Sequence, residues 1–247
     1  MPTPLTIPLT LQTPDGPVTV QIGTTEDKVS VPSVMSAGAT LSDALGEVAV
    51  RLAEKHGAPV QCRRGCGACC RQLVPVSPIE AFAVEEAFQS LPVEQQGRIR
   101  ARIATTREAL HESGLEERLA HIPPGPAGRA VVLDYFALQL PCPFLEDEAC
   151  QIYASRPFAC RDLLSASDPV HCEDPGGGQV RRVPVLMDMG RAMRSVSAAV
   201  FGESEPPRIP LPQALAYAEE KRALRGTVAR GVDLVKGLLS ALSAQRR

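Results

Sequence analysis

The sequence predicts a mainly α-helical fold with a short N-terminal β-hairpin and an irregular, cysteine-rich metal-binding centre. Two runs of alternating apolar residues near the start indicate the hairpin, and apolar residues at helical spacing further along indicate the helices. All eight cysteines fall between residues 62 and 172, which places the centre in the middle of the chain. With 247 residues, 44% of them hydrophobic, the chain can bury a core without metal, so a metal site is evidence about function.

The β-hairpin is expected at the start of the chain. Apolar residues alternate with other residues from Leu5 to Leu11 and again from Val18 to Ile22. Between these runs, the residues from Pro14 to Pro17 supply turn chemistry. The pattern therefore predicts two paired strands.

A helix is expected to lead the chain to the first cysteine. Four apolar residues recur at helical spacing, namely Leu41, Leu45, Val48 and Leu52. Thr40 and Asp43 are spaced as a capping box, and Gly57 is placed as the stop signal. The sequence thus predicts a helix that begins near Thr40 and ends before Gly57.

Two or three helices are expected between the two groups of cysteines. Ser77, Pro78 and Glu80 combine an N-cap, a proline at the first helical position and a glutamate three residues after the cap. A helical stripe follows, formed by Ile99, Ile103, Thr106 and Leu110. Gly114 or the proline-rich loop at 123–126 should end this helical region.

Little regular structure is expected from Cys142 to Cys172, or in the polar loop at 173–179. One helix face should then end at Gly202, traced by Leu186, Met189, Met193, Val196 and Val200. A stiff connector at 206–212 precedes one last amphipathic helix. Its apolar face consists of Leu224, Val228, Val232, Val235, Leu239 and Leu242.

Three regions are predicted from this order of elements. Residues 1–58 hold the hairpin and the first helix, and residues 59–178 form the eight-cysteine metal-binding domain with its intervening helices. Residues 179–247 form a C-terminal helical region.

The first cysteine cluster is a C-x3-C-x2-C-C array that contains Cys62, Cys66, Cys69 and Cys70. Gly65 and Gly67 add no bulk and let the backbone fold tightly around something small, for which a metal is the best candidate. Disulfides are a poor alternative, because adjacent Cys69 and Cys70 could pair only under strain. A helical backbone from Cys66 onward would project three of these thiols to one side. The flanking arginines, which either lower the thiol pKa values or are simply solvated, are Arg63, Arg64 and Arg71.

The second group consists of Cys142, Cys150, Cys160 and Cys172. These spacings are too long for a zinc ribbon knuckle, so the fold must bring the thiols together. Eight thiols permit two four-thiolate sites, or one site with ligands from both groups while the other cysteines stay as thiols or serve a redox role. The sequence leaves both arrangements open. Isolated histidines such as His171 are more typical of surface or hydrogen-bonded positions and are not counted as ligands.

Composition excludes several classes of partner. No apolar run approaches the roughly 18 residues of a membrane span, and residues 1–8 lack the features of a signal peptide, so we expect a cytoplasmic protein. A formal net charge of -2 and the absence of tryptophan argue against nucleic acid as a partner. A protein partner is the remaining expectation.

Four segments carry a resemblance to a known family: Cys62 to Cys70, Pro141 to Leu145, Cys150 to Tyr153 and Arg156 to Arg161. In these segments the chain resembles the YkgJ-type CxxCxxCC cysteine-cluster family of zinc- or iron-chelating proteins, over roughly residues 60–175. The resemblance implies that all eight cysteines belong to one constellation, so all eight are taken as metal ligands. That cysteine core is also similar to the core of flagellin lysine N-methylases, which implies S-adenosylmethionine as a further cofactor.

Three functions follow as hypotheses. The favoured one is a metal-binding protein that holds an iron-sulfur cluster, most simply 4Fe-4S, or iron, for redox chemistry, sensing or metal handling. The first alternative is an S-adenosylmethionine-dependent, iron-sulfur-assisted protein methyltransferase, although no barrel pattern is visible. The second is a structural zinc module that binds a protein partner. Whether the protein is an enzyme is left open.

Overall fold

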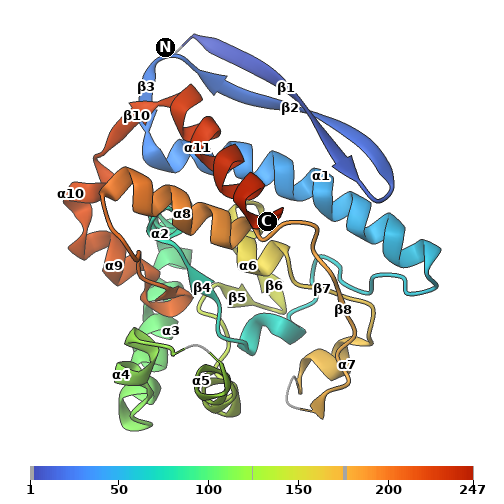
Figure 1. Ribbon diagram of the computed structural model, residues 1–247. Coiled ribbons are helices and arrows are strands. Elements are labelled where there is room, and N and C mark those ends of the chain that lie inside the picture. The colour runs from blue at the N-terminus through green and yellow to red at the C-terminus, as the bar shows by residue number, and fades with distance from the viewer. Residues whose placement is uncertain (1–2, 124, 175–176, 247) are drawn as a thin grey trace.

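The structure is a computed structural model that describes residues 3–123, 125–174 and 177–246. Its N-terminal hairpin lies across one side of the molecule, over helices α1 (Val34–Lys55) and α11 (Gly231–Ser243), as Figure 1 shows. The short elements of the cysteine-rich region occupy the middle of the molecule. The mainly α-helical fold with an N-terminal hairpin that the sequence predicts is confirmed.

The N-terminal hairpin pairs β1 (Pro4–Thr13) with β2 (Gly16–Thr25) in antiparallel register, with Ile7 opposite Ile22. Gly16 adopts a φ of 103°, a conformation that favours glycine and lets the chain reverse between the strands. The side chains of Val20 and Ile22 are buried, and β2 packs against α1. Alternation of apolar residues thus predicted both the strands and their buried face.

Helix α1 begins at Val34, earlier than the sequence predicts. Thr40 lies inside this helix and its hydroxyl donates a hydrogen bond to the carbonyl of Ser36 (3.1 Å), so the predicted capping box at Thr40 and Asp43 is wrong. The reason is burial: Val34 and Ala37 pack into the core and extend the apolar stripe toward the N-terminus. The predicted stop signal at Gly57 is confirmed, since Gly57 adopts a left-handed φ of 67° just after the helix ends.

Helix α2 (Pro78–Gln89) confirms the other predicted capping box. The Ser77 hydroxyl accepts a hydrogen bond from the Glu80 amide, and the Glu80 carboxylate accepts one from the Ser77 amide (2.8 Å). The same carboxylate is 1% exposed and also accepts from the Phe158 amide at 2.9 Å. Glu80 therefore joins the start of α2 to α6 (Phe158–Arg161), a helix that contains a cysteine.

In the described residues, four helices rather than two or three lie between the cysteine groups. They are α2, α3 (Val93–Glu112), α4 (Leu115–Ala120) and α5 (Pro126–Ala137). Helix α5 was not predicted, because residues 123–126 were interpreted as a loop that ends the helical region. Pro126 instead occupies the first turn of α5 and does not interrupt a helix.

In the residues that the structure describes, the two cysteine-bearing segments, 62–76 and 142–172, contain only short elements, as predicted for the second of them. Besides α6, they are the 3-10 helices η2 (Ala68–Arg71) and η3 (Tyr153–Ser155), the strands β4 (Pro75–Val76), β5 (Leu145–Glu146), β6 (Ala149–Cys150) and β7 (Leu164–Ser165), and helix α7 (Pro169–Cys172). The pairs β5–β6 and β7–β8 (Arg182–Val183) are antiparallel. Part of the predicted loop at 173–179 lies outside the described residues.

The helix predicted in the C-terminal region is α8 (Met189–Phe201), which ends at Gly202 with a φ of 70°. Leu186, which was expected on its apolar face, lies before the helix begins. The predicted connector includes β9 (Ile209–Pro210), which pairs with β4. Helices α9 (Ala214–Glu220) and α10 (Arg222–Arg225) follow.

The single helix predicted from Leu224 to Leu242 is wrong. The chain instead forms β10 (Val228–Arg230) between α10 and α11. This strand pairs with β3 (Lys28–Ser30), and the Gly231 amide donates to the Asp27 carbonyl at 3.1 Å. Pairing with a distant strand therefore overrides the helical spacing of the apolar residues.

The largest apolar core is built from both ends of the chain. Ile22 of β2, Leu41 of α1 and Leu238 of α11 are fully buried in it. Ile79 of α2 and Phe158 of α6 reach the same core. No helix in the described part of the chain combines the length and apolar composition that a membrane span requires. The division into three regions at residues 58 and 178 stays a prediction.

Candidate metal centre

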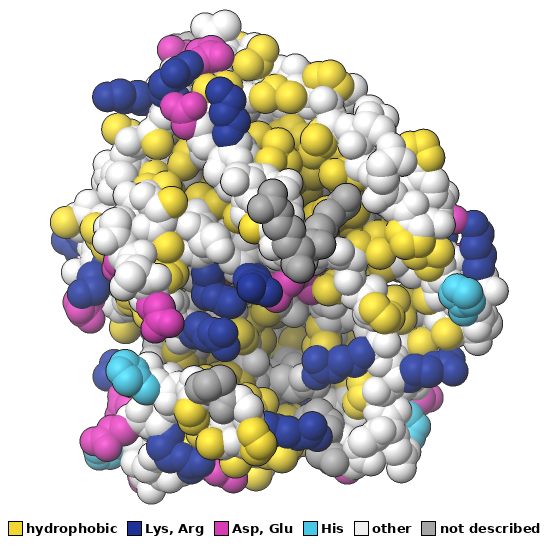
Figure 2. Space-filling view, viewed as in Figure 1, with side chains coloured by type: hydrophobic (Ala, Val, Ile, Leu, Met, Phe, Trp, Pro, Cys, Tyr) yellow, Lys and Arg dark blue, Asp and Glu magenta, His cyan; other side chains and the backbone are white. Residues whose placement is uncertain are grey.

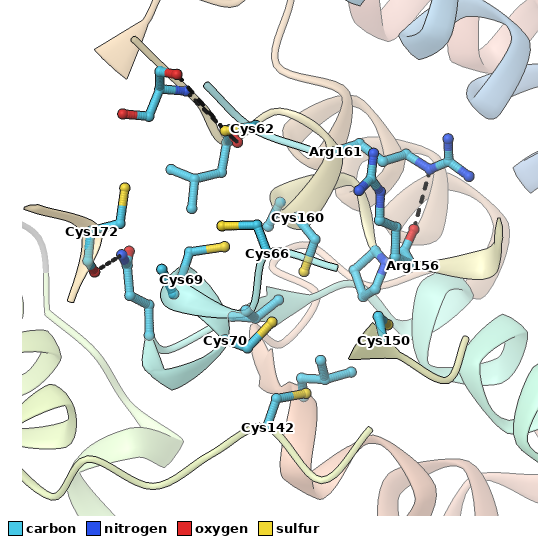
Figure 3. A pocket seen from close by; sticks show the side chains of 18 of the residues that line it. Cys62, Cys66, Cys69, Cys70, Cys142, Cys150, Arg156, Cys160, Arg161 and Cys172 are labelled. Atoms are coloured by element: carbon cyan, nitrogen blue, oxygen red, sulfur yellow. Dashed lines mark hydrogen bonds between the residues drawn. The ribbon is translucent and has the colours of Figure 1, made fainter. Parts of the chain in front are cut away.

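All eight cysteines line one cavity of about 420 Å³. Every one of them is a free thiol. Figure 3 shows the sulfur atoms of both cysteine groups around this space, although the groups are far apart in the sequence. The structure thus places every predicted site residue at one location, which the spacing of the second group alone could not predict.

The first cluster is shaped by a tight backbone. Gly65 has a φ of 84°, and the Cys66 amide donates to the Arg63 carbonyl (3.2 Å) to close the turn. The helical turn η2 begins only at Ala68, after Cys66, so a helix starting at Cys66 is not formed. Cys69 and Cys70 lie on η2 and follow one another without an intervening residue.

Two cysteines from opposite ends of the cysteine-rich region meet at Ser165 of β7. The Ser165 amide donates to the Cys62 sulfur at 3.2 Å, and the Ser165 hydroxyl hydrogen-bonds to the Cys172 thiol. The Gln72 side chain also donates to the Cys172 carbonyl (3.4 Å), which fixes α7 beside η2. Nothing in the sequence indicated Ser165, because its role depends on contacts across about 100 residues of chain.

Three further cysteines are held together by backbone pairing. The Cys142 amide donates to the Cys70 carbonyl at 2.7 Å. The Leu145 amide donates to the Cys142 carbonyl (2.9 Å), and Leu145 pairs directly with Cys150 across β5 and β6. The hydrogen bonds therefore connect η2 to the β5–β6 hairpin through Cys142.

The position of Cys160 depends on α6, which is anchored in the core. Phe158 is fully buried, and its ring packs against Gly38 of α1 so closely that a Cβ there would lie 2.6 Å from the ring. The Phe158 amide is also bound by Glu80. Cys160 lies in the same four-residue helix as Phe158, so the contacts that hold Phe158 also fix the position of Cys160.

Burial sets the charge of most of these thiols. It raises the pKa of the Cys142 thiol to about 12 and raises the pKa of Cys160 well above its ordinary value. A hydrogen bond from the Cys70 thiol lowers the pKa of Cys69 to about 7, with the positive charge of Arg156 acting in the same direction. The pKa of Cys69 is therefore lowered while those of Cys142 and Cys160 are raised, and these two buried thiols must lose protons when they bind metal.

One of the three arginines expected from the sequence, Arg63, lines the cavity. The other two interact with residues of its wall: Arg64 lies over the Tyr153 ring at 5.5 Å, and Arg71 pairs with the Glu148 carboxylate at 3.1 Å. Arg156 also lines the cavity, and its guanidinium lies 4.1 Å from the centroid of the same Tyr153 ring.

Arg156 is the arginine whose charge acts most widely on the thiols. It lowers the pKa of Cys69, and it acts in the same direction on the raised pKa values of Cys150 and Cys160. Its position before Pro157 was visible in the sequence, but its proximity to the thiols was not.

The surroundings of the cavity suit a thiolate-bound metal. Phe144 and Ile152 are buried beside Cys142 and Cys150, and they keep water from this wall. Thiolate is a soft ligand that prefers zinc, copper(I) and iron-sulfur clusters. Figure 2 shows Lys and Arg side chains gathered around a hollow over the middle of the molecule. The donor set and its dry, positively charged surroundings therefore fit a thiolate-bound metal centre.

The thiols surround the cavity rather than converge on one point. Within the described residues, no three His, Cys, Asp or Glu side chains are grouped closely enough to hold a single metal ion. A single tetrahedral ion would need four sulfur atoms at about 2.3 Å from its centre. The thiols would have to move inward to bind such an ion. They would have to move less to bind a larger metal-containing group.

One comparison with known proteins gives a match. The family model CxxCxxCC, described as a "putative zinc- or iron-chelating domain", matches residues 61–174 and so includes all eight cysteines. No curated protein and no solved structure matches the chain.

Proposed function

We propose, from the premise that residues 61–174 belong to the CxxCxxCC family of zinc- or iron-chelating domains, that this protein binds an iron-sulfur cluster through its cysteine thiolates. The observation that carries the proposal is the single cavity lined by eight free thiols. Membership of the family supports metal binding, and the choice of an iron-sulfur cluster over zinc rests on the arguments that follow.

The spacing of the thiols favours a cluster over a single zinc ion. A four-thiolate zinc site is compact, with ligands converging on one ion. Here the thiols line a cavity of about 420 Å³, which offers room for a group of several atoms. An iron-sulfur cluster takes cysteine thiolates as ligands and occupies more space than one ion.

The charges and walls of the cavity also support a cluster. Four thiolates around a cluster leave a net negative charge, which Arg156 offsets from its position against the Tyr153 ring. Phe144 and Ile152 keep the ligand sulfurs of the neighbouring wall dry. When bound, the cluster supplies one-electron redox chemistry, and this chain's own residues set its potential through charge and burial. The role we propose is therefore redox transfer, sensing or handling of iron.

Two other functions remain predictions from the sequence. S-adenosylmethionine-dependent methyl transfer rests on the resemblance to flagellin lysine N-methylases. A structural zinc module with a protein partner rests on the capacity of four thiolates to satisfy zinc.

The test is anaerobic purification followed by an absorption spectrum and by iron, zinc and acid-labile sulfide analysis of the same sample. We expect brown protein with broad absorption in the blue, and iron and sulfide in comparable amounts. Colourless protein that contains zinc without sulfide would contradict the iron-sulfur proposal and leave a zinc module. Protein that takes up neither metal would contradict metal binding altogether.

A variant pair links that metal to the cavity. The Cys66→Ala/Cys69→Ala double variant should lose metal and thermal stability together, because the thiolates are both ligands and cross-links. Gln61→Ala is the matched control, since Gln61 is exposed in the same segment and its side chain donates a hydrogen bond to the Pro59 carbonyl rather than to a cysteine. Equal metal content in both proteins would show that the metal is bound elsewhere.

A further inference from the structure

The eight thiols around the cavity fall into two sets of four. Figure 3 shows Cys62 and Cys172 on one side of the space and Cys142 and Cys150 on the opposite side, with Cys69 and Cys70 between them. The first set is Cys62, Cys66, Cys69 and Cys172. The second set is Cys70, Cys142, Cys150 and Cys160. Neither set follows the order of the sequence, since each combines residues of the first cluster with later ones.

The first set is held together at β7. Ser165 hydrogen-bonds to both Cys62 and Cys172, which binds two thiols to one strand. Figure 3 shows the sulfur atoms of Cys66 and Cys69 near each other, on the same side of the cavity as those of Cys62 and Cys172. These four thiols therefore form one group in space.

The second set is held together at the β5–β6 hairpin. The hydrogen bond from the Cys142 amide to the Cys70 carbonyl (2.7 Å) and the pairing of Leu145 with Cys150 connect three of its members. Cys160 lies on α6, and Figure 3 shows its sulfur on the same side of the cavity as those of Cys70, Cys142 and Cys150.

The two sets meet at the consecutive residues Cys69 and Cys70. Their thiols hydrogen-bond to each other, although each belongs to a different set. Cys69 also acts electrostatically on Cys142, Cys150 and Cys160 of the second set. The two sets are therefore adjacent, and a single peptide bond on η2 joins them.

We propose that the cavity holds two neighbouring four-thiolate metal centres, one on Cys62, Cys66, Cys69 and Cys172 and the other on Cys70, Cys142, Cys150 and Cys160. This inference rests on the proposed metal-binding function and extends it by assigning the ligands of each centre. Two centres use every thiol, whereas one four-ligand centre leaves four thiols of the cavity wall without a role.

Cobalt(II) is the probe for the test, because thiolate-bound cobalt gives charge-transfer absorption that can be counted by titration. The full-length metal-free protein is titrated anaerobically in its native form and as three double variants. Two variants each remove thiols from one set: Cys62→Ala/Cys172→Ala and Cys142→Ala/Cys150→Ala. The third, Cys62→Ala/Cys142→Ala, removes one thiol from each set and serves as the matched control.

We expect the native protein to bind two equivalents of cobalt. Each single-set variant should keep one equivalent with native absorption per ion, whereas the mixed variant should keep no complete four-thiolate site and lose the native intensity at both. One equivalent in the native protein, or identical titrations for the mixed and single-set variants, would overturn the assignment. Absence of cobalt binding in a protein that is purified with iron and sulfide would also overturn the assignment, whereas absence of both cobalt binding and iron and sulfide would overturn the proposed function. Circular dichroism melting of each variant establishes that its titration reports on folded protein.

Discussion

Glu80 is a carboxylate in the interior of the protein, and burial raises its pKa above the ordinary value despite three hydrogen-bond donors. Because the folded-state pKa is raised, the stabilising contribution is complete below the unfolded pKa of about 4.3 and is lost as the pH rises through the folded value. The hydrogen bonds that Ser77 and Phe158 donate to Glu80 lower its pKa, and so they reduce this loss of stability without abolishing it. At Glu80, hydrogen bonds that stabilise the fold are thus opposed by the cost of burying a charge.

The Glu80→Gln variant should therefore gain stability relative to the native protein as the pH rises from 4 to 8. The amide keeps one acceptor oxygen but carries no charge, and a tenfold change in the acid dissociation constant corresponds to about 1.4 kcal/mol. Urea unfolding of the metal-free protein at several pH values measures this difference. Glu86→Gln on the exposed face of α2 is the control and should show no such trend. A constant difference between Glu80→Gln and native protein would show that Glu80 does not titrate in this range.

Sequence reasoning at the residue scale succeeded for the cysteines and failed for their neighbours. The density of thiols from Cys62 to Cys70 and the resemblance predicted that the eight cysteines belong together, and all eight do line one cavity. That they ligate metal stays a prediction. Ser165 was missed, and Arg156 was named only as part of a segment that carries the family resemblance, because an arginine or a serine has no special spacing in the sequence. Their importance arises only when the fold brings them to the thiols.

At the scale of elements, two similar capping signals had opposite outcomes. Ser77 and Glu80 form a real capping box, whereas Thr40 lies within α1. The local residue types are alike, and the difference lies in what precedes each one. Before Ser77 the chain enters β4, which pairs with β9, while before Thr40 the buried residues Val34 and Ala37 continue the helix.

This contrast gives a matched pair of variants. Ser77→Ala should lower the free energy of unfolding by about 1 kcal/mol, because the Glu80 amide at the start of α2 loses its acceptor. Thr40→Ala should change stability by less than about 0.5 kcal/mol or raise it slightly, since alanine has the higher helix propensity. Urea unfolding of both variants gives the comparison. Equal destabilisation would mean that Thr40 contributes as a cap after all.

The elements that sequence reasoning missed share one cause. Helix α5 begins with Pro126, which was interpreted as part of a loop, and β10 exists only because β3 lies beside it. A proline at the first turn of a helix and a short strand paired over some 200 residues give little local signal. Long periodic stretches such as α3 and α8 were predicted correctly because their helical pattern is complete within the segment.

At the scale of the whole molecule, the two ends of the chain stabilise one core. Helix α11 packs against β2, α1 and α8, and β10 pairs with β3. Ile79 and Phe158 extend this core to the elements that carry the cysteine cavity. Stability near the termini should therefore influence the middle of the chain.

Leu238→Ala in α11 should lower the free energy of unfolding by about 2 to 5 kcal/mol, because Leu238 is fully buried. Hydrogen exchange should show that the amides of β2 lose protection together with those of α11. Lys236→Ala, on the exposed side of the same helix, should leave both segments protected. Unchanged protection of β2 in Leu238→Ala would show that the hairpin is held independently of α11.

The side-by-side position of Cys62 and Cys172, both bound by Ser165, has a consequence for the order of synthesis. The thiols of the first cluster leave the ribosome long before Cys172 is translated, because about 100 residues separate them. The set that includes Cys160 is complete before the set that includes Cys172. The nascent chain therefore carries the early thiols before their late partners have been made, and we expect it to need reducing surroundings until the last cysteine has emerged.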